Sequence, residues 1–405
     1  MTLRVLYVDF NSYFASVEQQ ENPRLRGKPV GVVPVMAETT CCIAASYEAK
    51  AHGVRTGTGV AEARRLCPDI VFVHGRHDIY VNYHHRLIEA VDAVAPVEVI
   101  HSIDEISVQL PTRWRTTESA RALAERIKQS IRERIGEHMK CSIGIAPNTF
   151  LAKTAADMQK PDGLTVIELA DLPKALHRLQ LRDLCGIGPN MEKRLHRAGI
   201  STVEALCRHS ARELRKAWGS VGGEILHAQL RGVEPRSEPR AQATLGHSHV
   251  LPPRLRNEPD ACSVAHRMLQ KAAMRLRKNR LAAGGLRLSV RQPARSRWSR
   301  EAHFSPTQNS AELTEALNAL WSLRSAPATP VAVGVTLFGL VGEDSLSRPL
   351  FDGAHPPVSP LLATVDRLNK RYGKTLLYLG SARKGAGEAP MRIAFNRIPD
   401  IEVER

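Results

Sequence analysis

The sequence lacks the cysteine pattern of a zinc site or a disulfide-linked scaffold. It has an odd number of cysteines, and no two of them are separated by two residues: Cys41, Cys42, Cys67, Cys141, Cys185, Cys207 and Cys262. This pattern predicts neither a disulfide framework nor a structural zinc ion. The adjacent His84 and His85 also have no partner at metal-ligand spacing, so we interpret them as surface or helix-packing residues.

Long apolar runs are absent as well. No stretch of about 18 apolar residues occurs, so no transmembrane helix and no membrane partner are expected. The stretch from Met1 to Asp9 is too short for a signal peptide and instead predicts a buried strand. We therefore expect a cytoplasmic protein.

Acidic residues are fewer than basic ones. The 57 Lys and Arg residues exceed the 41 Asp and Glu residues, which gives a net charge of +16 and a pI near 9.8. The segments 271–280 and 287–300 include the densest basic stretches, and 271–280 has no acid. A polyanionic partner such as nucleic acid is favoured, and the alternative is a protein that is merely basic.

The chain has 405 residues, which is typical of two to four domains. Residues 1–167 alternate between strand and helix patterns, and 97–110 reads as strand, break and strand. Such alternation indicates an α/β or α+β domain, and the hairpin favours a mixed or antiparallel sheet. The patterns predict strands over 3–9, 29–35, 70–73, 97–100, 106–110, 141–146 and 164–167, and helices over 11–20, 43–52, 60–67, 79–95, 117–135 and 149–159.

The second half of the chain changes character twice. Residues 169–231 read as short helices with Gly and Pro between them, and the polar 233–240 reads as a linker. β-α-β patterning returns over 244–340, with expected helices over 261–279 and 310–321 and strands over 286–291 and 331–340. From Gly342 onward Pro, Gly and Ser are frequent, and one helix is expected over 360–371.

Three acids stand out in apolar surroundings. Asp9 ends the first strand, and Asp104 and Glu105 lie in the hairpin. Carboxylates at such positions are costly unless a cation neutralises them, and oxygen ligands favour Mg²⁺ or Mn²⁺. Two ions so held can catalyse phosphoryl transfer. The alternative is a solvated turn, and adjacent strand residues point to opposite faces unless the strand bends or begins there.

Two further groups of residues suit phosphates. Tyr47 and Lys50 are one helical turn apart, and Lys160 follows a helix, so these side chains can offer charge to a triphosphate. Gly186 and Gly188 precede a helix that carries Lys193, which is typical of a helix-hairpin-helix element whose backbone amides bind a DNA phosphate. Solvated surface lysines and an ordinary helical turn are the alternatives.

Together these motifs resemble the Y-family DNA polymerases, the DinB and UmuC group, over residues 1 to about 380. The resemblance rests on four segments in the family's order and spacing: Tyr7-Val8-Asp9-Phe10-Asn11-Ser12-Tyr13-Phe14, Ser46-Tyr47-Glu48-Ala49-Lys50, Ser102-Ile103-Asp104-Glu105, and Leu151-Ala152-Lys153 through Lys160-Pro161-Asp162-Gly163.

The resemblance implies a role for each matching residue. Asp9, Asp104 and Glu105 would be the catalytic acids and, with the carbonyl of Phe10, would bind two Mg²⁺ ions, with Mn²⁺ as a substitute. Phe14 would be the steric gate against ribonucleotides, with a core phenylalanine as the alternative. Tyr47, Lys50 and Lys160 would bind the incoming deoxynucleoside triphosphate.

The implied fold is an α+β polymerase right hand with a β-α-β little finger. The palm would comprise 1–19 and 77–167, the fingers 20–76, the thumb 168–232, the linker 233–243, the little finger 244–341 and the tail 342–405. Primer-template DNA would contact the thumb and the basic little finger, at Gly186, Gly188, Lys193, Arg275, Arg277, Arg287 and Arg291.

Some positions depart from the commonest DinB pattern. Asn11 replaces a frequent Asp that is not the essential ligand, Lys50 replaces Arg, and Ala44 replaces Thr, so nucleotide affinity is expected to be weaker. The segment 345–352 resembles a sliding-clamp peptide ending in Leu350 and Phe351, but Ser347 replaces its Gln. A plain loop is the alternative there, and the need for an accessory subunit stays open.

The resulting expectation is template-directed, error-prone DNA synthesis across damaged templates without proofreading. A non-catalytic family member that acts as a DNA-bound scaffold is one alternative, although such relatives lack the three acids. A two-metal nuclease is another, but it would not need Phe14 or the triphosphate set.

Overall fold

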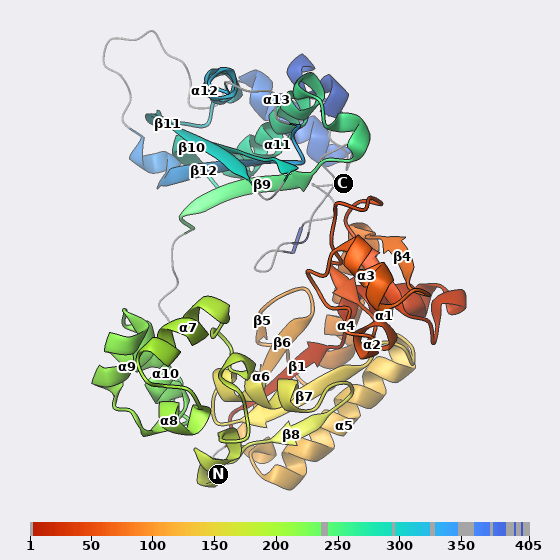
Figure 1. Cartoon of the computed structure of the whole chain (residues 1–405), viewed down its shortest axis with the longest axis vertical. Coiled ribbons are helices and arrows are strands. Elements are labelled where there is room, and N and C mark those ends of the chain that lie inside the picture. Colours follow the sequence, from red (N-terminus) through yellow and green to blue (C-terminus); the bar gives the residue numbers. More distant parts are fainter. Residues whose placement is uncertain are drawn as a thin grey trace.

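The computed structural model describes residues 3–235, 242–293, 296–324, 329–346, 360–372, 376–385, 393 and 398–399. These residues form three β-sheets and four clusters of buried apolar side chains. In Figure 1 the sheet of the C-terminal part stands apart from the N-terminal sheets. No helix in these ranges is long and apolar enough to cross a membrane.

The largest sheet has five strands in the order β5-β6-β1-β7-β8. Its strands are β1 (Val5–Phe10), β5 (Val99–Ile100), β6 (Glu105–Gln109), β7 (Cys141–Ala146) and β8 (Leu164–Val166). The β7–β8 pair is parallel and the other pairs are antiparallel, so the expected mixed sheet is confirmed.

Helices cover both faces of this sheet, which explains why every residue of β1 is buried. Leu6 and Val8 belong to one cluster with α1 (Tyr13–Glu21), α4 (His77–Asp92) and α5 (Thr117–Arg134), whereas Val5 and Tyr7 belong to another with α6 (Thr149–Met158). Because side chains alternate along a strand, Asp9 lies on the α6 face.

A small sheet of order β3-β2-β4 follows α1 in the chain. It comprises β2 (Val30–Val33), β3 (Ala44–Ala45) and β4 (Val71–His74) and packs with α2 (Tyr47–Ala51) and α3 (Val60–Leu66) around its own core. The helix predicted over 43–52 is therefore wrong in its first part. Ala44 and Ala45 pair with β2 instead, and the Ser46 side chain caps a shorter helix.

Short helices follow the first sheet, as the sequence predicts. They are α7 (Pro189–Arg197), α8 (Val203–Arg208), α9 (Ala211–Trp218) and α10 (Gly222–Gln229). Their buried leucines share a cluster with α6, which places this bundle against the helix that covers the Asp9 face of the sheet. Single 3-10 turns occur at η1 (Pro23–Leu25), η2 (Thr112–Trp114), η3 (Leu169–Asp171), η4 (Lys174–Leu176), η5 (Leu181–Asp183), η6 (Pro253–Leu255) and η8 (Glu343–Ser345).

The C-terminal sheet has four antiparallel strands in the order β11-β10-β12-β9. They are β9 (Thr244–Val250), β10 (Leu281–Arg291), β11 (Arg297–Thr307) and β12 (Ala332–Gly342), and one face packs on α11 (Glu258–Lys278) and α12 (Ser310–Ser322). The order along the chain is β-α-β-β-α-β. The predicted β-α-β pattern therefore lacked β11, whose polar sequence hides its pairing with β10.

The chain after this sheet returns to α11. The predicted helix α13 (Pro360–Arg371) is present, and Asp366 on it forms an ion pair with Arg277 of α11. The turn η9 (Gly380–Gly385) also packs on α11. A hydrogen bond of 2.6 Å from Arg256 Nη2 to Thr39 Oγ1 links the two halves of the molecule.

Candidate active site

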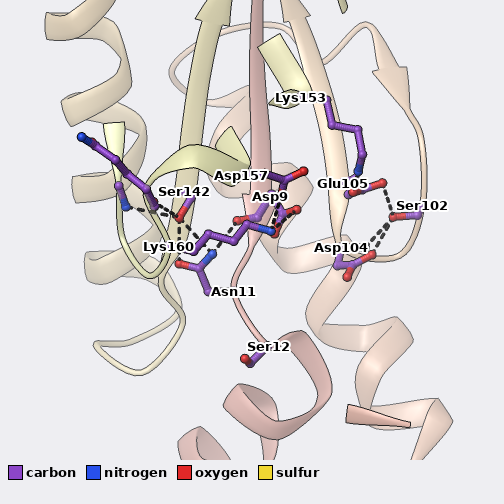
Figure 2. A network of polar contacts seen from close by, with 12 residues as sticks. Asp9, Asn11, Ser12, Ser102, Asp104, Glu105, Ser142, Lys153, Asp157 and Lys160 are labelled. Atoms are coloured by element: carbon purple, nitrogen blue, oxygen red, sulfur yellow. Dashed lines mark hydrogen bonds and ion pairs between the residues drawn. The ribbon is translucent and has the colours of Figure 1, made fainter. Parts of the chain in front are cut away.

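The three predicted acids meet at one end of the five-stranded sheet (Figure 2). Asp9 and Glu105 are direct partners in the antiparallel register of β1 and β6. Cross-strand partners point to the same face. β6 begins at Glu105, so Asp104 lies in the preceding bend and not on the strand. Adjacent residues within a strand would point to opposite faces of the sheet. Because Asp104 precedes the strand, its side chain and that of Glu105 can lie on the same side.

Hydrogen bonds fix the bend that carries Asp104. The Ser102 hydroxyl donates to Asp104 Oδ1 at 2.6 Å and lies 3.4 Å from Glu105 Oε2. The amide of Phe10 donates to the carbonyl of Asp104 at 2.8 Å. The carboxylates of the bend are thus held beside the end of β1.

The electrostatics of the acids are those of a site that attracts cations. Burial raises the pKa of Asp9 to about 7, and Asp104 adds to this rise while Lys160 opposes it. Burial and the neighbouring Glu105 also raise the pKa of Asp104. Burial alone would raise the pKa of Glu105, but the hydrogen bond and charge of Lys153 hold it below its ordinary value. Like charges this close together are stabilised by a bound cation.

Two ammonium groups contact these acids in the structure. Lys160 Nζ lies 2.7 Å from Asp9 Oδ2 and 2.8 Å from Asp157 Oδ1. Lys153 Nζ contacts Glu105 Oε1. Among the described residues, no three Asp, Glu, His or Cys side chains converge closely enough to hold one metal ion. Figure 2 shows why, because Glu105 faces Lys153 while Asp9 faces Lys160.

Asn11 has a different role from its acidic neighbours. It is 2% exposed, its amide Nδ2 donates to Ser142 Oγ at 3.1 Å, and its Oδ1 accepts from the backbone amide of Asp162 at 2.8 Å. It therefore holds the loop that follows Lys160.

The predicted triphosphate residues lie beside the acids. Lys50 Nζ donates to Ser12 Oγ at 2.7 Å and stacks over the Tyr47 ring at 4.4 Å. Burial and then the charge of Lys160 lower the pKa of Lys50, so the two ammonium groups face the same space. Ser12 has a left-handed backbone, with φ of 47°, at the start of α1. The fold thus brings Tyr47 and Lys50 of α2 together with Lys160 from a distant segment of the chain.

Phe14 is half-buried in the first turn of α1. Its ring stacks on Tyr80 with 4.4 Å between centroids and 16° between planes. Tyr80 is fully buried, and its hydroxyl donates to Glu18 Oε1 at 2.7 Å. The orientation of the Phe14 ring is therefore fixed from behind by a rigid neighbour.

The predicted hairpin is present between η5 and α7. Gly186 has a φ of +89°, which a side chain would disfavour, and Gly188 precedes α7 as its N-terminal cap residue. Lys193 lies on α7. A cavity of about 390 Å³ is lined by this hairpin and by Asp157 of α6, so the hairpin opens towards the acids.

The C-terminal sheet presents arginines on the face opposite its helices. Leu286, Leu288 and Val290 are buried against α11 and α12, so Arg287 and Arg291 point away from them. Arg291 and Arg297 are direct cross-strand partners, and Arg287 pairs with Glu301 at 2.6 Å. Two like charges in register favour an anion between them.

The two arginines predicted to bind DNA from α11 are placed differently. Arg275 is 7% exposed and its Nη1 lies 3.0 Å from His247 Nε2. Arg277 forms a two-point ion pair with Asp366, at 2.6 and 2.9 Å. Both guanidinium groups are engaged within the protein, because α11 packs between the sheet and α13. Leu350 and Phe351, the predicted clamp residues, lie outside the described residues.

Several residues of the site had no predicted role. Lys153, Asp157 and Ser102 contact the acids or their lysines, and Tyr80 supports Phe14. The spacing of Lys153, Asp157 and Lys160 at i, i+4 and i+7 signals one face of a helix and its extension. No pattern in the sequence indicates that Tyr80 supports Phe14, because the two residues are far apart in the chain and meet only in the folded protein.

Three family models match the chain. The impB/mucB/samB family matches residues 8–157, the C-terminal domain of that family matches 242–350, and the thumb domain of DNA polymerase iota matches 182–234. The three matches cover the acids, the arginine-bearing sheet and the hairpin in turn.

Relatives match over almost the full length. DNA polymerase IV of Moorella thermoacetica is 36% identical, with 95% of this chain and 97% of the relative covered. DNA polymerase IV of Pelotomaculum thermopropionicum is 34% identical, with coverage of 96% and 99%.

Solved structures show the same architecture. A Y-family DNA polymerase chimera of Dbh and Dpo4 has a TM-score of 0.70 at 25% identity, over 84% of this chain and 99% of that one. An insertion ternary complex of Dbh DNA polymerase has a TM-score of 0.56 at 26% identity, over 84% and 99%. The chain belongs to the DinB-like Y-family of DNA polymerases, the impB/mucB/samB family.

The family defines the enzyme class. The chain is a DNA-directed DNA polymerase of translesion synthesis, with the right-hand and little-finger architecture of that family. The alternative of a non-catalytic scaffold is not favoured, since Asp9, Asp104 and Glu105 are all present and lie together.

Proposed function

We propose that Asp9, Asp104 and Glu105, with the backbone carbonyl of Phe10, form the metal-binding centre of this polymerase. The observation that supports this most is the cross-strand pairing of Asp9 with Glu105 beside a bend that holds Asp104. All these donors are oxygen atoms, which suits Mg²⁺, with Mn²⁺ as a substitute. When bound, two such ions would activate the primer 3′-hydroxyl and neutralise the leaving pyrophosphate.

The lysines beside the acids would bind the incoming deoxynucleoside triphosphate. Lys160 and Lys50 bring positive charge to one space, and the Tyr47 ring and the Ser12 hydroxyl orient Lys50. Phe14 is the first side chain on α1 that can face the sugar, and its stacking on Tyr80 would keep it from yielding to a 2′-hydroxyl.

Primer-template DNA would lie between the thumb hairpin and the arginine face of the C-terminal sheet. The backbone amides at Gly186 and Gly188, with Lys193, would bind phosphates near the cavity that reaches Asp157. Arg287 and Arg291 would bind phosphates of the duplex from the exposed sheet face.

The domain boundaries and partners complete the proposal. The proposed domains are the palm (1–19 and 77–167), fingers (20–76), thumb (168–232), linker (233–243), little finger (244–341) and tail (342–405). From the sequence alone we also propose clamp binding through Leu350 and Phe351, and a cytoplasmic location, because the substrate is DNA. The sequence leaves the need for an accessory subunit open.

Primer extension tests the metal assignment. Wild-type protein, Asp104→Ala and a control, Asp69→Ala at an exposed position of the fingers, are compared on undamaged and lesion-bearing templates with Mg²⁺. We expect extension by wild type and Asp69→Ala on both templates and none by Asp104→Ala. Equal extension by all three proteins contradicts the metal assignment, and tight DNA binding without extension by wild type favours the scaffold.

A further inference from the structure

Two of the three proposed metal-binding acids, Asp9 and Glu105, already contact a cation supplied by the chain. Lys160 Nζ contacts Asp9 Oδ2 at 2.7 Å, and Lys153 Nζ contacts Glu105 Oε1. The two lysines come from one element, since Lys153 lies on α6 and Lys160 follows its end, with Asp157 between them. One helix therefore delivers a cation to each of two strands of the sheet.

Both lysines can leave without movement of the backbone. Their side chains are 23% and 28% exposed, whereas the side chain of Asp9 is 9% exposed. Each ammonium group stands at the end of a flexible four-carbon chain, which adapts its position readily. The acids, in contrast, are fixed by β-sheet pairing and by the Ser102 hydrogen bond.

The cluster of acids and lysines has a net negative charge, which favours the binding of metal ions. Four acids, Asp9, Asp104, Glu105 and Asp157, face two lysines, so the fully ionised cluster has a charge of 4 − 2 = 2 negative units. The carboxylate oxygens that contact the lysines are the same oxygens that a divalent ion would bind. A metal ion and a lysine ammonium group therefore cannot occupy Asp9 or Glu105 at the same time.

We propose that Lys153 and Lys160 are placeholder cations that occupy Glu105 and Asp9 until divalent metal displaces them. This inference rests on the proposed function. The lysines neutralise the acids of the free enzyme and weaken its metal binding. Displacement frees Lys160 beside Lys50, where the triphosphate is proposed to bind, so metal and nucleotide binding are coupled through one side chain. Lys153 is a positioning residue in this scheme, whereas Lys160 also binds the triphosphate once it is freed.

Binding of Mn²⁺ to the full-length protein without DNA or nucleotide tests the proposal, with the free ion measured by electron paramagnetic resonance. Lys153→Met and Lys160→Met should each bind Mn²⁺ about tenfold more tightly than wild type, because one neighbouring charge alters a buried ionic equilibrium by at least that factor. Lys153→Arg keeps the charge and should bind as wild type does. Lys384→Met removes a lysine that pairs with Asp260 in the little finger and is the matched control.

Unchanged or weaker Mn²⁺ binding by both Met variants overturns the proposal, and so does an absence of Mn²⁺ binding by every variant. Primer extension by wild type in Mg²⁺ is measured in parallel, since its failure would refute the polymerase assignment and not the placeholder role alone. A second measurement needs no variant. Mg²⁺ should increase the acetylation rate of Lys153 and Lys160 in wild type, but not that of Lys384, and equal rates with and without Mg²⁺ contradict displacement.

Discussion

His84 connects α4 to the bend that carries Asp104, one of the proposed metal-binding acids. Its side chain is 1% exposed, and Nδ1 donates to the carbonyl of Ile103 at 2.8 Å. Burial is the main reason that the pKa of His84 falls to about 4. The histidine is therefore neutral in the folded protein at neutral pH, in agreement with its interpretation as a helix-packing residue.

The depressed pKa of His84 predicts acid sensitivity of the fold. In the unfolded chain His84 takes up a proton near pH 6.5, whereas the folded protein resists protonation down to about pH 4. Its contribution to stability is thus complete above pH 6.5 and is lost as the pH falls to 4, by up to about 3 kcal/mol. Urea unfolding at pH 7.5 and pH 5 should show a smaller pH effect in His84→Gln than in wild type. His85→Gln, at the exposed neighbour, should behave as wild type, and an equal pH effect in all three proteins would contradict the assignment.

Phe14 is the second residue whose environment predicts a measurable effect. Phe14→Ala should raise ribonucleotide incorporation relative to deoxynucleotide incorporation about 10- to 100-fold, because the ring that would meet the 2′-hydroxyl is gone. Tyr80→Leu should relax the discrimination less, since it removes the support that stacks behind Phe14 at 4.4 Å. Single-nucleotide insertion kinetics measure both ratios, and Tyr80→Phe, which keeps the stacked ring, is the control. Unchanged sugar discrimination in Phe14→Ala would refute the gate.

At the scale of elements, the contact between β7 and α6 positions the site lysines. A Cβ atom at Gly144 of β7 would lie 1.9 Å from the carbonyl oxygen of Ala152 and 2.3 Å from the amide of Ala156. The helix backbone therefore rests directly on the strand. Glycine at this position sets how far α6, with Lys153 and Asp157, stands above the acids.

Substitution of that glycine tests the contact. Gly144→Ala should lower the free energy of unfolding by about 1–3 kcal/mol and also reduce primer extension, because α6 must move away from the sheet. Thermal or urea unfolding measures the first effect. Gly380→Ala, at a site where an added Cβ meets open space, is the control and should change stability by less than about 0.5 kcal/mol. Unaltered stability of Gly144→Ala would show that α6 adjusts without strain.

At the scale of the whole molecule, the excess positive charge is distributed unevenly. Arginines of α11 are buried or bound to Asp366, whereas Arg287 and Arg291 of β10 and Arg297 of β11 lie on the exposed sheet face. The net charge of +16 by itself predicts DNA binding but not the surface that binds. In the C-terminal part, Arg287, Arg291 and Arg297 remain available to bind DNA on the face of the sheet opposite α11 and α12.

DNA affinity measured against salt concentration tests this surface. Arg291→Ala and Arg297→Ala should each weaken binding to duplex DNA of any sequence and reduce the slope of log Kd against log salt by about 1, because each loses one phosphate contact. Arg132→Ala, at an exposed position of α5, should leave the slope unchanged. Equal slopes in all variants would exclude the sheet face as the duplex-binding surface.

The sequence alone determined the local elements and the residue types of the site. Continuous apolar strands, capped helices and turn residues gave β7 and α13 their predicted bounds. The acids were singled out because carboxylates in apolar strands need a cation, and the surrounding motifs and the family resemblance then favoured a metal site over a solvated turn. Local patterns failed at Ala44 and Ala45, which form a strand because β2 offers them pairing partners, and at β11, whose alternation is mainly polar.

The tertiary structure decided which side chains meet. Register places Asp9 opposite Glu105, the start of β6 frees Asp104 from the strand, and α6 brings Lys153 and Lys160 to the acids. It also separated Arg291, which faces outward, from Arg277, which is neutralised by Asp366. Backbone propensity acts within a few residues along the chain, whereas strand pairing, packing and ion pairs join segments that are far apart in it, and the site depends on these distant contacts.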